Sequence, residues 1–430
     1  MYLEKLKLHN FRTFDSLEVT FHPKMTVLVG ANGAGKTSIL EAAIVMIGTI
    51  FSPMDGVGSY GFDKEDARRV VYMLGSGEDS QKMFPVEVEA TGTIDEKNIF
   101  WKRALNSEKG RTTIKEAEDI IKIGEEYQSR LRKGDATLRL PIVVYYGTGR
   151  LWDYHKEKNS DIFKNNTRTN GYINCLDGTA NVKLMMNWFK KMTIIQYQRR
   201  ENNEGETPEL HVVYKAMADC LKSVSNYEDV NIRYNLNTNE LDVVYVENGK
   251  KNKLPLSLMS DGYKSTISLV ADIAYRMTIL NPQLGDEVLE KTDGIILIDE
   301  VDLHLHPLWQ QNILEDLSSI FPKVQFIVST HAPEIINTAK KENICILKQD
   351  MVDRPAIETY GKDANAVLKS VMKVTERPVS VKENFQEFYD AMAKEEYEMA
   401  EQILQNIENE IGTDDPELVS CWVKLDLANM

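Results

Sequence analysis

Cysteine and long apolar segments are scarce in this sequence, and their scarcity excludes several classes of protein. The four cysteines are far apart and form no C-x-x-C pair, so neither a disulfide framework nor a zinc ribbon is expected. The longest apolar run covers residues 39–51 and is interrupted by Glu41, which makes it too short and too polar to span a membrane. The first residues lack the apolar core of a signal peptide. We therefore expect a cytoplasmic protein with no membrane partner.

Basic charge is also in deficit. The chain has 51 Lys and Arg against 66 Asp and Glu, a net charge of −15, so a broad basic face for duplex DNA is not expected. The acidic residues are concentrated at one end, where residues 380–430 contain 13 Asp and Glu against three Lys. The preceding 379 residues therefore carry a charge of only about −5, which leaves room for a local basic groove. The length of 430 residues, with 42% hydrophobic and 27% charged residues, is typical of a globular protein of two or three domains.

The apolar pattern predicts an α/β fold. Runs that are apolar throughout, typical of strands buried on both faces, occupy residues 25–29, 140–146, 294–298 and 324–329. Alternating segments predict two antiparallel strands within residues 1–21, further strands within 84–101, and a hairpin of 230–234 with 241–246. Helices are predicted at 37–51, 113–133, 182–191, 209–224, 263–277, 307–320, 383–393, 396–411 and after Pro416.

This pattern suggests five consecutive regions. They are an N-terminal lobe (1–112), a helical insertion (113–140), a strand, helical lid region and hairpin (141–254), a C-terminal lobe (255–350) and a C-terminal acidic helical region (351–430). The last region and the charged 113–133 helix are candidate docking surfaces for a partner. The alternative interpretation is that both are ordinary solvated charged helices.

The strongest motif is a phosphate-binding loop. The run Gly30-Ala31-Asn32-Gly33-Ala34-Gly35-Lys36-Thr37 fits G-x-x-x-x-G-K-[ST] and lies between a predicted buried strand and a predicted helix. Glycines let backbone N–H groups close around a β-phosphate, Lys36 reaches the β and γ oxygens, and the Thr37 hydroxyl ligates Mg²⁺. The following helix directs its positive dipole end at the phosphate. The loop therefore predicts binding of a nucleoside triphosphate with magnesium.

Two acids end the buried strand at 294–298. We expect Asp299 to hold Mg²⁺, directly or through water, and Glu300 to act as the general base that poises the attacking water. His331, at the tip of the 324–329 strand, is placed to contact a γ-phosphate and sense its loss, although a merely capping role is the alternative. The pair His304 and His306 lacks a third ligand of matching spacing, so a metal site there is not favoured.

A third phosphate-contacting segment is Leu258-Met259-Ser260-Asp261-Gly262-Tyr263-Lys264, which opens a predicted helix about 40 residues before the acid pair. Ser260 and the Gly262 N–H could bind phosphate at that helix start. Taken alone, the segment is better explained as an ordinary helix N-cap. Its position between the phosphate loop and the acid pair favours the functional interpretation.

In this order, the phosphate loop, Ser260-Asp261-Gly262-Tyr263, Ile298-Asp299-Glu300, Leu305-His306-Pro307 and Ser329-Thr330-His331 resemble the head of ABC/SMC-type ATPases. The opening Leu8-His9-Asn10-Phe11-Arg12 and the Gly-Ala-Asn-Gly form of the loop are similar to the RecF/SMC/OLD branch. Residues 141–152, residues 360–365 and the acidic helical tail most resemble the PtuA family of Septu and retron-associated anti-phage systems. The resemblance implies a P-loop NTPase of the ABC-ATPase head type, with a mixed sheet, an antiparallel β lobe, helical insertions and an acidic helical tail.

The resemblance also implies roles for individual residues. Nucleotide and magnesium would be bound by Arg12, Asn32, Gly33, Ala34, Gly35, Lys36, Thr37 and Ser38, with Gly30 opening the loop. Lys36, Glu300 and His331 would be catalytic, and Thr37 and Asp299 would hold the metal. Ser260 and Gly262 would act on a nucleotide bound by a second copy of the chain, which implies an ATP-sandwiched homodimer or a larger oligomer.

Several residues depart from the family pattern. Asp261 and Tyr263 stand where many ABC proteins have Gly and Gln, and His306 stands where an Asp is usual. No convincing Q-loop glutamine is found, although Gln81 and the segment 63–68 are candidates. We therefore expect slow hydrolysis, or ATP used mainly as a clamp.

Two functions follow from the resemblance. In the first, the chain is a regulatory ATPase of a bacterial anti-phage complex. The Toprim acids of an OLD-type nuclease are not found after His331, so we expect a nuclease partner, and the resemblance implies one of HNH type. In the second, it is a RecF-like DNA-repair ATPase that clamps DNA directly, through Lys190, Lys191, Arg199 and Arg200 with Trp188, Phe189 and Tyr197 interleaved. DNA or RNA is therefore a possible partner. The alternative to this second interpretation is a helix with a buried aromatic face and solvated lysines.

Overall fold

The computed structural model describes residues 1–75, 77–151, 167–178, 182–372 and 377–429. The described chain forms two compact units, residues 1–364 and 365–430. Trp152, in the segment that carries the closer family resemblance, lies outside the described residues. The five predicted regions remain a proposal.

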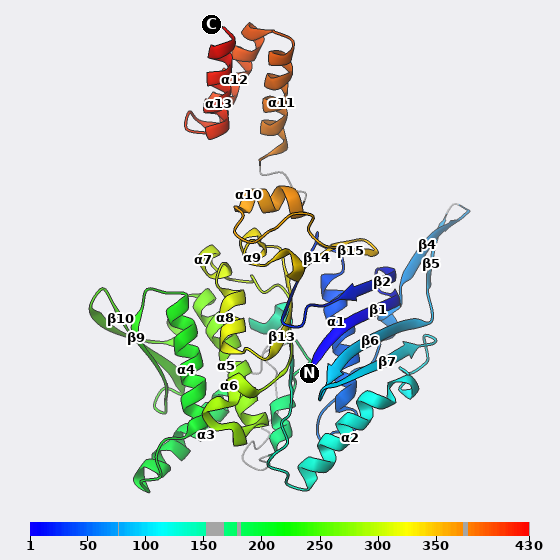
Figure 1. Cartoon of the computed structure of the whole chain (residues 1–430), viewed down its shortest axis with the longest axis vertical. Coiled ribbons are helices and arrows are strands. Elements are labelled where there is room, and N and C mark those ends of the chain that lie inside the picture. The colour runs from blue at the N-terminus through cyan, green and yellow to red at the C-terminus, as the bar shows by residue number, and fades with distance from the viewer. Residues whose placement is uncertain (76, 152–166, 179–181, 373–376, 430) are drawn as a thin grey trace. The chain divides into compact units, whose positions relative to one another are not determined.

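A six-stranded sheet forms the centre of the first unit (Figure 1). Its order is β15-β14-β3-β13-β12-β8, and every pair is parallel except β14 with β15. The strands β3, β8, β12 and β13 are buried along their whole length, as expected for a sheet covered on both faces. The strands of this sheet are β3 (Met25–Val29), β8 (Ile142–Tyr146), β12 (Gly294–Ile298), β13 (Val324–Thr330), β14 (Ile344–Lys348) and β15 (Met351–Asp353).

An antiparallel sheet of order β2-β1-β6-β7 forms a second layer. Helix α1 (Lys36–Ile47) contacts β1, β6 and β7 of this sheet as well as β13 of the central sheet. It is therefore packed between the two sheets, which explains why ten of its residues are buried. The strands are β1 (Tyr2–Phe11), β2 (Phe14–Thr20), β6 (Val86–Ile94) and β7 (Lys97–Leu105). This arrangement confirms the predicted mixed sheet with an antiparallel lobe.

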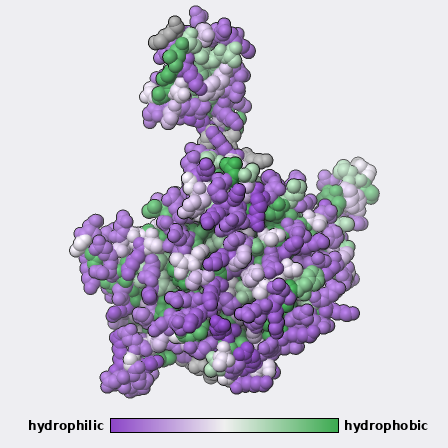
Figure 2. Space-filling view, in the orientation of Figure 1, coloured by the Kyte–Doolittle hydropathy of each residue, from purple (hydrophilic) through white to green (hydrophobic). Residues whose placement is uncertain are grey.

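A hairpin of β4 (Arg69–Leu74) with β5 (Gly77–Lys82) was not predicted. Most of the surface in Figure 2 is hydrophilic, but the hairpin carries exposed apolar side chains at Val71, Met73 and Leu74. Its second strand, β5, has the sequence GEDSQK, which lacks the alternating apolar residues that would indicate a strand.

Helices and a three-stranded antiparallel sheet, β11-β10-β9, complete the first unit. Helix α4 contacts both α5 and β9, and α3 contacts α4, α5 and β9. The strands are β9 (Glu228–Asn235), β10 (Glu240–Glu247) and β11 (Lys250–Pro255). The helices are α2 (Glu118–Arg132), α3 (Val182–Glu201), α4 (Pro208–Ser223), α5 (Asp261–Leu280), α6 (Val288–Lys291), α7 (Pro307–Gln310), α8 (Ile313–Ile320) and α9 (Pro333–Ile336).

The prediction of one helix over residues 307–320 is wrong, because α7 and α8 are separate. The Asn312 side chain donates to the carbonyl oxygen of Leu308, four residues earlier, at 3.1 Å. Asparagine competes in this way with the backbone hydrogen bonds of a helix, which favours a break.

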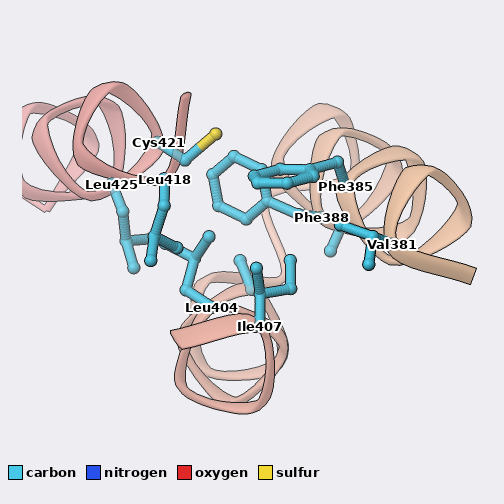
Figure 3. Packing of buried hydrophobic residues seen from close by; sticks show 10 residues of the cluster. Val381, Phe385, Phe388, Leu404, Ile407, Leu418, Cys421 and Leu425 are labelled. Carbon is cyan, nitrogen blue, oxygen red and sulfur yellow. The ribbon is translucent and has the colours of Figure 1, made fainter. Parts of the chain in front are cut away.

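The second unit begins in α10 (Ala364–Val367) and contains α11 (Val379–Ala393), α12 (Tyr397–Ile411) and α13 (Pro416–Ala428). Side chains of the last three helices form a core of their own around Phe388, Leu404 and Leu418, each fully buried (Figure 3). Asp415 caps α13 by accepting from the backbone N–H groups of Glu417 and Leu418. The predicted helical tail is therefore a packed three-helix unit.

Candidate active site

The phosphate loop is held in shape by Gly35. This residue caps the N-terminus of α1 in the left-handed region, with φ of 94°, and a Cβ there would lie 2.2 Å from Cζ of the buried Phe14. Glycine is therefore required for both backbone conformation and space. The first turn of α1 carries no acidic side chain, so its N–H groups and dipole remain available to an anion.

Lys36 is buried inside the loop, with only 6% of its surface exposed. Its Nζ donates to the carbonyl oxygens of Gly30 at 3.0 Å and Ala31 at 3.2 Å. Burial lowers the pKa of Lys36, and the charges of three acids oppose this effect: Asp299, Glu300 and Asp302. The Lys36 ammonium therefore lies in the electrostatic field of these three acids. Two backbone carbonyl groups hold the ammonium, and phosphate oxygens of a ligand can replace them.

Asp299 connects the phosphate loop to the end of β12. Its Oδ2 accepts from Thr37 Oγ1 at 2.7 Å, and its backbone N–H donates to the carbonyl oxygen of Tyr146 at 2.8 Å. Only 2% of the residue is exposed. The structure thus joins two residues predicted to bind magnesium, Thr37 and Asp299, although they are 262 positions apart in sequence.

These oxygen donors fit magnesium. Hydroxyl and carboxylate oxygens are hard ligands, and Mg²⁺ usually takes one or two carboxylates together with waters and substrate phosphates. The described residues contain no group of three or more His, Cys, Asp or Glu side chains that could hold a metal ion. Thr37 and Asp299 would supply two oxygen ligands, and nucleotide phosphates and waters would supply the others.

Ser329, at the end of β13, organises both predicted acids. Its hydroxyl donates to Oδ1 of Asp299 and accepts from the backbone N–H of Glu300 at 2.8 Å. Glu300 itself has φ of 46°, a left-handed conformation that costs a non-glycine residue about 1 kcal/mol or more. The serine hydrogen bond offsets part of this strain, so the main chain at Glu300 is fixed.

The next residue of β13, Thr330, makes a similar contact to a third acid, Asp302. Thr330 Oγ1 donates to Oδ1 of Asp302 at 2.6 Å and accepts from the backbone N–H of Ala332 at 3.0 Å. In the motif Ser329-Thr330-His331, the sequence pattern predicts a role for the histidine alone. Ser329, Thr330 and Asp302 are therefore residues that sequence reasoning missed, and the signal that could have found them is the pair of hydroxyls beside the predicted switch histidine.

His331 is half-buried beside this cluster. Burial and the charge of Lys36 lower its pKa, against the opposing charges of Asp302, Glu300 and Asp299. The imidazole is therefore neutral near pH 7, where one ring nitrogen can accept and the other can donate a hydrogen bond.

The predicted signature residues lie at the start of α5. Ser260 is the exposed N-cap, and its side chain makes no capping hydrogen bond. Gly262 is buried, and a Cβ on it would lie 2.9 Å from a ring carbon of Trp309 and 3.0 Å from the carbonyl oxygen of His304. The helix start is thus packed on the segment that follows the acids, with the serine facing outward.

His306 acts as a helix cap. Its Nδ1 accepts from the backbone N–H of Leu308 at 3.3 Å, at the start of α7. The neighbouring His304 has a left-handed backbone with φ of 64°. His306 therefore has a local structural role, and the expectation of no metal site at this pair stays a prediction.

The side chain of Arg12, which was predicted to contact nucleotide, contacts two acidic side chains in this structure. Its side chain pairs with Glu41 of α1 and, at 2.9 Å, with Asp66. Asp66 belongs to the candidate Q-loop segment 63–68, and its carbonyl oxygen also accepts from the Arg12 backbone N–H at 2.7 Å. Gln81, the other candidate, lies exposed on β5. A role for Arg12 toward nucleotide remains a prediction.

The proposed basic and aromatic stretch on α3 is largely structural. Trp188 and Phe189 are buried, and their rings contact Tyr275 and Tyr214 respectively. Arg199 donates to the carbonyl oxygen of Glu204. The alternative interpretation of a buried aromatic face is therefore confirmed for Trp188 and Phe189, while Tyr197 is 56% exposed.

The AAA domain family model matches residues 5–242, more than half of the chain. The chain belongs to the AAA domain family. It is 28% identical to the retron Ec83 probable ATPase of Escherichia coli, over 98% of this chain and 86% of that protein. It is 26% identical to the Septu protein PtuA of Bacillus thuringiensis, over 81% of this chain and 76% of that protein.

A solved structure of the SMC head domain from Thermotoga maritima is 16% identical, covers 83% of this chain and 100% of that domain, and has a TM-score of 0.44. The predicted resemblance to retron ATPases and Septu PtuA is confirmed over most of the chain. The roles of its individual residues rest on the geometry described above. No helix among the described residues has the length and apolar character needed to cross a membrane.

Proposed function

We propose that this protein binds and hydrolyses ATP with Mg²⁺ at the phosphate loop, and that the resulting states regulate an anti-phage defence complex. The observation that carries the proposal is the chain of contacts from Thr37 through Asp299 to Ser329 and the backbone of Glu300. A loop that binds phosphate, a ligand pair for magnesium and a candidate general base are joined by direct hydrogen bonds.

Different residues of the site have different roles in the proposed hydrolysis of ATP. Loop N–H groups, with Asn32, Gly33, Ala34, Gly35 and the buried Ser38, surround the phosphates, and Lys36 exchanges its carbonyl partners for β and γ oxygens. Thr37 and Asp299 would hold magnesium, which would neutralise charge on those oxygens. Glu300 orients and deprotonates the attacking water. His331, neutral near pH 7, contacts the γ-phosphate and changes partners when that phosphate leaves.

Ser260 and the Gly262 N–H complete the site from a second copy. The support is that Ser260 is exposed and makes no side-chain cap to its own helix, while the buried Gly262 fixes the helix start against Trp309. An exposed helix start with an available hydroxyl suits an anion bound by another subunit. ATP would then stabilise a homodimer, and a larger oligomer could be built from such dimers.

The relatives supply the biological setting. The proteins that match over most of this chain are named as a retron probable ATPase and a Septu protein. We propose that this chain likewise acts in cytoplasmic anti-phage defence and, as the resemblance implies, controls an HNH-type nuclease partner. The acidic second unit, with its independent core, is the candidate docking element. The RecF-like alternative loses support because Trp188 and Phe189 are buried.

The substitution Glu300→Gln tests the chemistry. We expect ATP turnover to fall at least 100-fold, on the order of 3 kcal/mol in transition-state stabilisation, while ATP binding persists and dimers accumulate in size-exclusion chromatography with light scattering. Glu287→Gln, on an exposed acid, is the control. If the Glu300 variant hydrolyses ATP as fast as the parent protein, Glu300 is not the general base.

A separate experiment tests the nuclease partner: the protein should copurify with the product of the neighbouring gene.

A further inference from the structure

A groove outside the ATP site is formed by α3, α4 and β9. It has a volume of about 300 Å³, at the lower end of the range for small-molecule sites. Helix α4 contributes one face of the groove, while α3 and β9 provide the walls. In the hydropathy view the surface around the free end of α3 is strongly hydrophilic (Figure 2).

Cations line this groove although the chain as a whole is strongly acidic. They are Arg200 from α3, Lys215 and Lys222 from α4, and Arg233 from β9. Two acids share the lining, Glu206 and Asp219. Four cations against two acids give a local positive excess in a protein of net charge −15, so the groove favours an anionic ligand.

The four cations differ in whether they already contact a polar side chain of the protein. Arg200 pairs with Glu206 at 3.0 Å, and Arg233 donates to the side chain of Asn231 at 3.0 Å. Among the described residues, Lys215 and Lys222 form no ion pair. These two lysines are seven residues apart on α4, which places them on the same helix face and about 10 Å apart along its axis. The spacing is measured along the axis of α4, and the two flexible side chains can each reach a different phosphate of one strand.

An aromatic ring completes the site. Tyr197 of α3 lines the groove and is 56% exposed. Tyr214 lies deeper, stacked on Phe189 with ring centroids 5.6 Å apart, and its hydroxyl accepts from the backbone N–H of Tyr234. Tyr214 is thus part of the scaffold, and Tyr197 is the ring available to a ligand. An exposed aromatic ring beside spaced cations is the combination that binds bases and phosphates of a single strand.

We propose that this groove binds single-stranded nucleic acid, with a base on Tyr197 and the phosphates on Lys215 and Lys222. An acidic peptide would use the lysines but would gain little from the tyrosine. A duplex would not expose its base faces to the ring. This site is separate from the phosphate loop, and its occupancy does not depend on the ATPase assignment.

The test uses the full-length protein without ATP or magnesium. Fluorescence anisotropy would follow a labelled oligo-dT or oligo-U of about 20 nucleotides between about 50 and 200 mM salt, with a duplex of the same length, dTMP and polyglutamate as competitors. We expect single strands to bind and to be displaced poorly by all three. Each phosphate contact contributes about −0.7 to the slope of log affinity against log salt for single strands.

Substitutions locate the binding. Lys215→Glu with Lys222→Glu should weaken single-strand affinity at least tenfold and reduce the salt slope by about 1.4, and Tyr197→Ala should weaken it about tenfold while Tyr197→Phe retains it. Lys250→Glu with Lys251→Glu, on exposed β11, makes the same charge change elsewhere and should alter affinity less than twofold. Equal weakening by this control, absent binding by the parent protein, or equal competition by dTMP, duplex or polyglutamate would overturn the proposal.

Discussion

The hydroxyl of Ser329 donates to the carboxylate of Asp299, and through this contact the end of β13 fixes an acid at the end of β12. The same hydroxyl accepts from the N–H of the next residue, Glu300. The Ser329 side chain therefore orients both acids proposed for ATP hydrolysis. This is a positioning role, because Ser329 itself need not contact the nucleotide.

Ser329→Ala should lower ATP turnover about 10- to 100-fold. The substitution removes a hydrogen bond to a charged group, worth about 1.5–3 kcal/mol, and frees the strained backbone of Glu300. Steady-state phosphate release would measure turnover, and thermal melting would check folding. Ser319→Ala, which removes a hydroxyl from α8, is the matched control. Unaltered turnover in the Ser329 variant would contradict the positioning role.

Gly35→Ala should destabilise the protein by about 3–5 kcal/mol. The new Cβ would meet Phe14 at 2.2 Å, and the residue would keep a positive φ. Gly33 offers a close comparison, because it also has positive φ, of 78°, but no atom lies within 4 Å of the position that a Cβ would occupy. Gly33→Ala should therefore cost only about 1 kcal/mol. Denaturant unfolding measures both, and equal losses would show that the Phe14 contact is unimportant.

His331 should contribute to a loss of stability at acidic pH. Because the folded state lowers its pKa, the unfolded chain binds more protons in the window from its ordinary value near 6.5 down to the lowered one. The stabilising effect of the neutral imidazole is complete above that window and is lost as pH falls through it. His331→Asn should therefore show a smaller decrease in melting temperature between about pH 7.0 and 5.5, by about 1 °C.

The control for this measurement is His211→Asn, which removes an exposed histidine from α4. Its Nδ1 lies 3.8 Å from Oδ1 of Asp286, so this variant measures what loss of an exposed histidine does to the melting temperature, and the His331 variant is compared with it. A His331 variant whose melting temperature falls as steeply as that of the parent would show that this imidazole is not linked to folding.

Asp272→Ala should destabilise the protein by about 3–5 kcal/mol. Asp272 on α5 accepts from Arg276 at 2.7 Å and from the Tyr146 hydroxyl at 2.7 Å, and all three groups are buried. Loss of the acid would leave the buried guanidinium without its counter-charge. Glu287→Ala removes one partner of the exposed pair with Lys291 and should change stability by about 0.5 kcal/mol or less. Denaturant unfolding that gives similar values for both would contradict this account.

Short stretches of sequence were sufficient to predict those elements whose structure depends on neighbouring residues along the chain. The phosphate loop, the buried strands at 25–29 and 294–298, and the hairpin of β9 with β10 follow from patterns within a few residues. The break between α7 and α8 was missed because the periodic pattern continues across it, while a single asparagine side chain competes with the helix backbone. The β4–β5 hairpin was missed because β5, with the sequence GEDSQK, has no apolar alternation to pair with β4.

By itself, the sequence determined the chemistry that is available: a glycine-rich loop with Lys36 and Thr37, two acids after an apolar strand, and a histidine after another. Only the tertiary structure decided which of these groups meet. Thr37 reaches Asp299, and Asp299 reaches Ser329, because β3, β13 and β12 are adjacent parallel strands whose carboxyl ends share one edge of the sheet. The groove of α3, α4 and β9 likewise depends on packing between distant segments, since side-chain contacts across elements carry no fixed spacing in sequence.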